Sequence, residues 1–133
     1  EIWAGFRVGR RAGVESVQEG ADGISARIRA FPRAWSRLER SWHFTGEAVR
    51  IRDRVLESGR SGARSTARLH FHPDVPLRGK GGAWEAGGLR VAFEGAGAVR
   101  NVEYLYAPEF NVRIPARCLE IDFDSQLVTV LGP

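Results

Sequence analysis

Hydrophobic and polar residues alternate along much of this chain, so that apolar side chains recur at every second position over short runs. The clearest case covers residues 35–44, 49–55 and 64–72, three runs that glycine-containing turns separate. Alternation with a period of two residues is typical of a strand that has one face on a core and the other in water. We therefore predict three consecutive antiparallel strands in this part of the chain.

The same pattern continues on both sides of this block. Further strands are predicted at residues 13–19, 24–31, 83–85, 89–93, 99–106, 111–115, 117–123 and 127–131. No segment keeps the apolar period of 3.6 residues that a stable helix would need. The pattern predicts an all-β fold, an antiparallel two-sheet β-sandwich of about ten strands. We expect residues 1–133 to form a single β-sandwich domain.

Apolar positions of these runs form the predicted core. It contains Leu38, Trp42, Phe44, Ile51, Leu69, Phe71, Leu119, Ile121 and Val130. The single cysteine, Cys118, excludes an intrachain disulfide. Because it lies in an apolar run, we expect it to be a buried, unreactive thiol.

Composition narrows the possible classes of protein. The chain is 43% hydrophobic and 27% charged, which argues against intrinsic disorder. It has no run of 18 apolar residues, so no membrane-spanning helix is predicted. The basic residues lack regularly interleaved aromatic residues, so we expect no nucleic-acid partner. The chain begins at Glu1 and contains no methionine, and we therefore expect it to be a piece of a longer protein.

The polar face of the three central strands is rich in cationic side chains. Arginine suits bidentate recognition of carboxylate, sulfate or phosphate groups. The candidate substrate-binding residues are Arg50, Arg52, Arg54, Arg68, His70 and His72. A plainer interpretation of the arginines is an ordinary charged sheet face, ion-paired to Asp53, Glu39 or Glu57.

Two histidines two residues apart on a strand, His70 and His72, point to the same face and could together bind a metal ion. The chain supplies no further ligands at a fitting spacing, and we predict no metal and no cofactor. The simplest alternative is a solvated or hydrogen-bonded pair, with Asp74 fixing the turn that follows. Contact with a sugar or with another domain is a third possibility.

Four stretches, taken in order, resemble the C-terminal β-sheet domain of the heparinase II/III-like polysaccharide lyases. They are IWAGFRVGRRAGV (residues 2–14), ERSWHFTGEAVRIRDRV (39–55), RLHFHPDV (68–75) and CLEIDFDSQLVTVL (118–131). The HFHPDV segment that follows the FTG and IRDRV segments is the most specific of these.

The resemblance implies a larger enzyme with an N-terminal α/α-toroid, located in the periplasm or cell envelope. Such lyases cleave acidic polysaccharides by β-elimination, with a Tyr and an Asn or His from the toroid and a His from the first strands of the β-domain. The matching His-rich segment would precede Glu1. We therefore assign no catalytic residue and expect no lyase activity from this chain alone. The expected partners are the toroid and an acidic polysaccharide such as heparan sulfate or alginate.

Two other functions fit the same residues. One is a free-standing carbohydrate-binding module, and the other is a cupin-like metal-dependent β-barrel enzyme built on His70 and His72. If strands are missing before Glu1, apolar groups such as Trp3 and Phe6 would lie uncovered. In that case we expect self-association.

Overall fold

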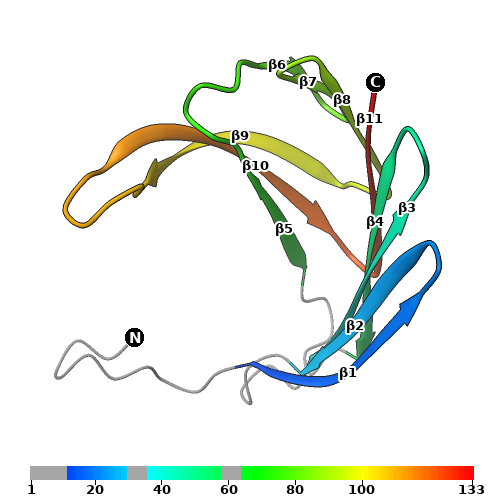
Figure 1. Ribbon diagram of the computed structural model, residues 1–133. Coiled ribbons are helices and arrows are strands. Elements are labelled where there is room, and N and C mark those ends of the chain that lie inside the picture. The colour runs from blue at the N-terminus through cyan, green and yellow to red at the C-terminus, as the bar shows by residue number, and fades with distance from the viewer. Residues whose placement is uncertain (1–11, 30–35, 58–63) are drawn as a thin grey trace, which may run out of the picture.

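The computed structural model describes residues 12–29, 36–57 and 64–133 (Figure 1). These residues form eleven strands in two antiparallel sheets, and no helix occurs among them. The predicted all-β, two-sheet sandwich is therefore confirmed. In the described ranges, no helix is long and apolar enough to cross a membrane.

The larger sheet has eight strands in the order β1-β2-β3-β4-β11-β8-β7-β6. Their bounds are β1 Gly13–Gly20, β2 Gly23–Arg29, β3 Arg37–Phe44, β4 Val49–Glu57, β6 Leu77–Lys80, β7 Ala83–Ala86, β8 Leu89–Glu94 and β11 Gln126–Gly132. The smaller sheet has three strands in the order β5-β10-β9. Their bounds are β5 Ser65–His70, β9 Ala98–Tyr106 and β10 Ile114–Phe123.

The prediction of three consecutive neighbouring strands is wrong at its third member. Strands β3 and β4 do pair, with Trp42 opposite Ile51. The other edge of β4 pairs with β11, where Ile51 faces Thr129. Since both edges of β4 are occupied, β5 instead joins the second sheet and pairs with β10, placing Leu69 opposite Leu119. Alternation identifies strands, but it does not identify their neighbours.

The buried core lies between the small sheet and the half of the large sheet that runs from β4 to β6. Leu119 and Ile121 are fully buried there, as predicted, with Leu127 from β11. Leu69 and Phe71 are partly buried and pack against this cluster, so their predicted inward direction is confirmed. Cys118 is also buried as expected, and burial raises the pKa of its thiol.

Two other core predictions are wrong. Phe44 is 51% exposed, because it ends β3 beside the hairpin turn and no residue of β1, β2 or β3 belongs to the core cluster. Val130 lies opposite Arg50 and Ala92, and therefore on the sheet face that carries the arginines. The predicted core positions Leu38, Trp42 and Ile51 are only half-buried.

Candidate functional site

The six candidate binding residues do not share one face, which corrects the expectation of a single basic sheet. Arg50, Arg52 and Arg54 lie on β4 of the large sheet, on the face opposite the core. The other three candidates, Arg68, His70 and His72, lie on or just after β5 of the small sheet. The reason is the altered pairing of β5, which carries its polar face to the other layer of the sandwich.

Ion pairs occupy two of the three β4 arginines. Arg54 pairs with Glu39 at 3.3 Å, and Arg50 pairs with Glu94 on β8 at 3.2 Å. Arg52, between them, has no ion pair with any residue in the described ranges. The interpretation as an ion-paired sheet face therefore holds for Arg54 and Arg50, but not for Arg52.

The other expected acidic partners bind different arginines. Asp53 lies in register with Leu127, on the core side of β4, and accepts hydrogen bonds from Arg40 at 2.6 and 3.1 Å. Glu57 pairs with Arg37 at 3.1 Å. Neither carboxylate neutralises Arg52, so its guanidinium is available to an external anion.

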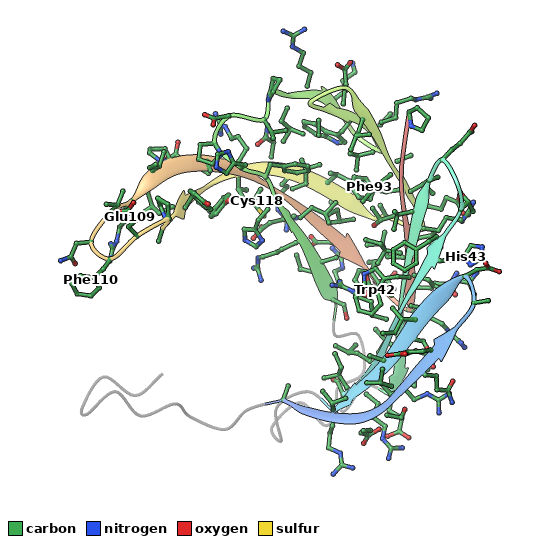
Figure 2. All side chains as sticks on the ribbon, in the orientation of Figure 1. Trp42, His43, Phe93, Glu109, Phe110 and Cys118 are labelled. Atoms are coloured by element: carbon green, nitrogen blue, oxygen red, sulfur yellow. The ribbon has the colours of Figure 1, made fainter. Side chains whose placement is uncertain are left out.

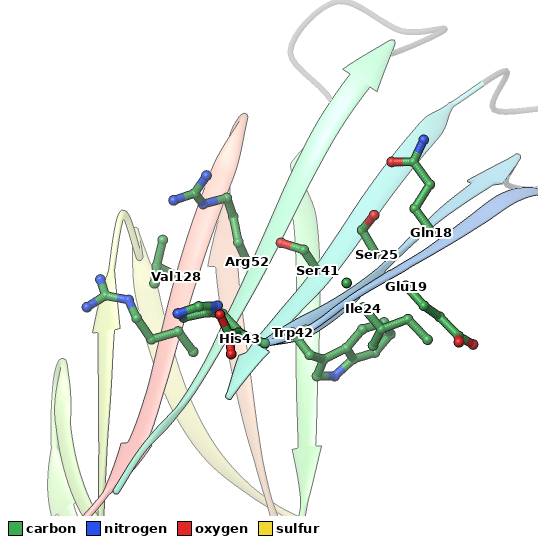
Figure 3. A pocket seen from close by; sticks show the side chains of 13 residues that line it. Gln18, Glu19, Ile24, Ser25, Ser41, Trp42, His43, Arg52 and Val128 are labelled. Atoms are coloured by element: carbon green, nitrogen blue, oxygen red, sulfur yellow. The ribbon is translucent and has the colours of Figure 1, made fainter. Parts of the chain in front are cut away.

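A hollow of about 600 Å³ lies beside Arg52 on the outer face of the large sheet, across β1, β2, β3, β4 and β11 (Figure 3). The strand register explains its polar floor. Gln18 pairs with Ser25, Ser25 with Ser41, Ser41 with Arg52, and Arg52 with Val128. These five side chains form one row across five strands. The hollow exists because the middle of the row carries two short serine side chains between longer ones.

The next row across the sheet has even smaller residues in its floor. Gly20 pairs with Gly23, Gly23 with His43, and His43 with Arg50. A Cβ atom at Gly23 would come within 2.2 Å of the Trp42 carbonyl oxygen, so only glycine fits without a shift of the backbone. The glycines leave the hollow open at this end of the sheet.

Sequence reasoning missed Gln18, Ser25, Ser41 and His43 as candidate site residues. Each occupies a polar position of an alternating run, and nothing in a single run marks it as special. Their adjacency depends on the register of β1, β2 and β3 and on the placement of β4. These residues could have been brought together from the sequence only by pairing the first three strands as consecutive hairpins.

On the small sheet, the two histidines pack against two tyrosines of β9. The ring centroids of His70 and Tyr104 are 4.7 Å apart, and those of His72 and Tyr106 are 5.0 Å apart, both edge to face. The backbone N–H of Asp74 donates to Nδ1 of His72 at 3.4 Å. Asp74 thus bonds to His72 at the turn after β5, whereas His70 contacts the ring of Tyr104.

A charged network holds Arg68 beside these rings. Arg68 donates to Glu120 at 2.9 Å, and this hydrogen bond lowers the pKa of the Glu120 carboxyl. Arg68 therefore already has a carboxylate partner on its own sheet, which it shares with Arg100. Within the described ranges, no group of three His, Cys, Asp or Glu side chains could hold a metal ion.

Comparison with known proteins gives similarity in structure alone. No family model and no curated protein matches the sequence. The fold matches heparan sulfate lyase HepC from Pedobacter heparinus with a TM-score of 0.66 and 12% identity, over 92% of this chain and 22% of that one. It also matches heparinase III, the BT4657 gene product, with a TM-score of 0.59 and 12% identity, over 92% of this chain and 21% of that one.

These matches confirm at the level of the fold the resemblance found in the sequence. The chain shares the β-sandwich architecture of a part of heparinase III-type lyases. It spans about a fifth of the length of the chains it matches.

Proposed function

We propose that this chain is the C-terminal β-sandwich part of a longer polysaccharide lyase that acts on uronic-acid polysaccharides by β-elimination. The observation that carries the proposal is the fold match over 92% of this chain to about a fifth of a heparan sulfate lyase. In this role the sandwich supports an N-terminal α/α-toroid and one wall of the substrate groove, and it supplies no catalytic residue.

The chemistry of β-elimination supports a catalytic centre outside this chain. The reaction needs a base at the carbon next to the uronate carboxylate and a group that neutralises that carboxylate. A candidate base, Tyr104, already donates its O–H to the carbonyl oxygen of Phe71 at 2.7 Å. Its ring packs on His70, which ties both side chains to the sheet. The base and its partners would therefore come from the toroid and from the first strands of the β-domain.

The candidate binding residues belong to this proposal as two separate contacts with an acidic polymer. Arg50, Arg52 and Arg54 form the first contact on the large sheet, and Arg68, His70 and His72 form the second on the small sheet. Exposed arginines attract a polyanion at low salt, and this attraction weakens as salt screens it.

An activity comparison between two proteins tests the proposal. The chain alone and the longest natural polypeptide that contains it are incubated with heparan sulfate, alginate and other uronate polymers. Unsaturated uronate ends are then followed by ultraviolet absorbance. We expect product only from the longer polypeptide. Product from the chain alone, above a heat-killed control, would contradict the proposal, as would inactivity of the longer polypeptide on every polymer.

A carbohydrate-binding module is the second candidate function. The observation that favours it is the polar hollow beside Arg52 on the outer face of the large sheet. Under this alternative, the chain alone binds an acidic polysaccharide while the longer polypeptide releases no unsaturated product.

A further inference from the structure

We propose that the hollow on the outer face of the large sheet binds a short segment of a uronic-acid oligosaccharide, with Arg52 holding its carboxylate or sulfate group. This inference rests on the proposed function and adds to it a defined binding site and a ligand chemistry.

The shape of the hollow suits an extended, polar ligand. Its central row runs from Gln18 through Ser25 and Ser41 to Arg52, across four neighbouring strands. Three strand spacings make this row about 14 Å long. A volume of about 600 Å³ falls within the usual range for small-molecule sites. A sugar chain lying across the strands would thus contact every residue of the row.

The chemistry of the row favours a sugar. Serine hydroxyls both donate and accept hydrogen bonds, and the Gln18 amide can do the same at one end. Figure 3 shows Gln18, Ser25, Ser41 and Arg52 on the same side of the strands. The floor therefore offers hydroxyl and amide partners to sugar hydroxyls, and one guanidinium at its end.

The charge at the site favours an acidic sugar. Arg50 and Arg54 are partly neutralised by Glu94 and Glu39, whereas Arg52 has no carboxylate partner among the described residues. A planar guanidinium binds carboxylate or sulfate with two parallel hydrogen bonds.

Two acidic residues border the hollow, Glu19 and Asp22. Glu19 shares a register line with Ile24 and Trp42, and the side chains of these three residues point to the opposite face (Figure 3). Asp22 lies in the turn after β1, beyond the row of Gly20 and Gly23. The end of the hollow at Arg52 therefore stays open to an anion.

Calorimetric titration of the chain tests the site. The probes are tetrasaccharides from heparan sulfate, which carry carboxylate and sulfate, oligomannuronate, which carries carboxylate only, and a neutral maltotetraose. We expect both acidic probes, or the sulfated one alone, to bind and the neutral probe not to bind. The difference between the acidic probes identifies the anionic group that Arg52 holds.

Two variants and one matched control locate the binding. Arg52→Ala should weaken binding about tenfold or more, as expected for a lost charge-assisted hydrogen bond. Ser41→Tyr should abolish binding by filling the hollow, with thermal melting used to verify that the variant folds. The control is Arg27→Ala, on the same outer face of the sheet but outside the hollow and already paired with Glu39 at 2.8 Å, and it should stay within about twofold of the parent protein.

Several results would overturn the inference. These are equal binding of the neutral probe, unchanged binding by Arg52→Ala, equal losses in Arg52→Ala and Arg27→Ala, or no binding of either acidic probe. The proposed function is judged separately, by product formation in the longer polypeptide. If that polypeptide is active and Arg52→Ala leaves its KM unchanged, the hollow is not a binding site although the proposed function stands.

Discussion

Arg100 lies directly opposite Glu120 in the pairing of β9 with β10, yet it makes its bidentate ion pair with Asp122, the diagonal neighbour. Nη2 of Arg100 is 2.9 Å from Oδ1 of Asp122 and 3.3 Å from the nearer oxygen of Glu120. Thr66 donates a further hydrogen bond to Asp122 at 2.8 Å. These contacts tie all three strands of the small sheet together on its outer face.

Because of this network, the stability of the folded protein should depend on pH. Hydrogen bonds from Arg100 and Thr66 hold the pKa of Asp122 well below its usual range, and a hydrogen bond from Arg68 lowers that of Glu120. A lowered pKa in the folded state contributes stability above the unfolded pKa, which is about 4 for a carboxyl group. This contribution is lost as the pH falls toward the folded values. We therefore expect the melting temperature to fall steadily below about pH 4.

Asp122→Asn is the variant that separates this network from the other carboxylates. It should melt below the parent protein at pH 7, because Arg100 loses a charged partner. The gap should narrow as the pH drops, since the parent protein loses the same interaction by protonation. A constant gap between pH 7 and pH 2 would show that the ion pair does not control acid stability.

Leu119→Ala should destabilise the protein by about 2–5 kcal/mol, because it leaves a cavity at a fully buried position. The matched control is Leu105→Ala on the paired strand β9, where the side chain is 53% exposed and the expected change is within about 0.5 kcal/mol. Urea unfolding measures both values. Similar losses in the two variants would mean that the core is not centred on Leu119.

Gly23→Ala should destabilise the protein by about 1–3 kcal/mol, because its Cβ would meet the Trp42 carbonyl oxygen at 2.2 Å. Gly13→Ala is the control, since a Cβ there meets nothing within 4 Å and should be neutral or slightly stabilising. Thermal melting compares the two variants. Equal melting temperatures would show that Gly23 does not lie as close to the Trp42 carbonyl oxygen as the structure has it.

Self-association should increase with salt. Val17 and Phe44, on the core-side face of β1 and β3, are 53% and 51% exposed. Phe110, at the tip of the turn between β9 and β10 (Figure 2), is 92% exposed. Apolar patches of this kind favour association, while the net charge of +4 opposes it at low ionic strength. Light scattering across a salt series measures the effect.

Phe44→Ser should reduce this association. Ala92→Ser, on the outer face of β8, should leave it unchanged. A monomer at every salt and protein concentration would show that the exposed apolar side chains do not drive contact between copies.

The sequence by itself determined most of the strands and the face on which most side chains lie, although it missed β6 and divided β10 into two strands. Alternation with a period of two dictates these features locally, because successive side chains of a strand point to opposite faces. It therefore predicted the all-β fold, the inward direction of Leu119 and Ile121, and the shared face of His70 and His72. It erred at Phe44, where the direction was right but no second sheet covers the strand.

Only the tertiary structure decided which strands are neighbours. Backbone hydrogen bonds are nearly the same for every residue, so a strand edge carries little information about its partner. The strand β11, far along the chain, takes the edge of β4, and β5 passes to the other sheet. This exchange separates the arginines from the histidines. The register of the first four strands also places Arg52 at the end of a row of serines, without an ion pair to any described residue. No local pattern could reveal this arrangement.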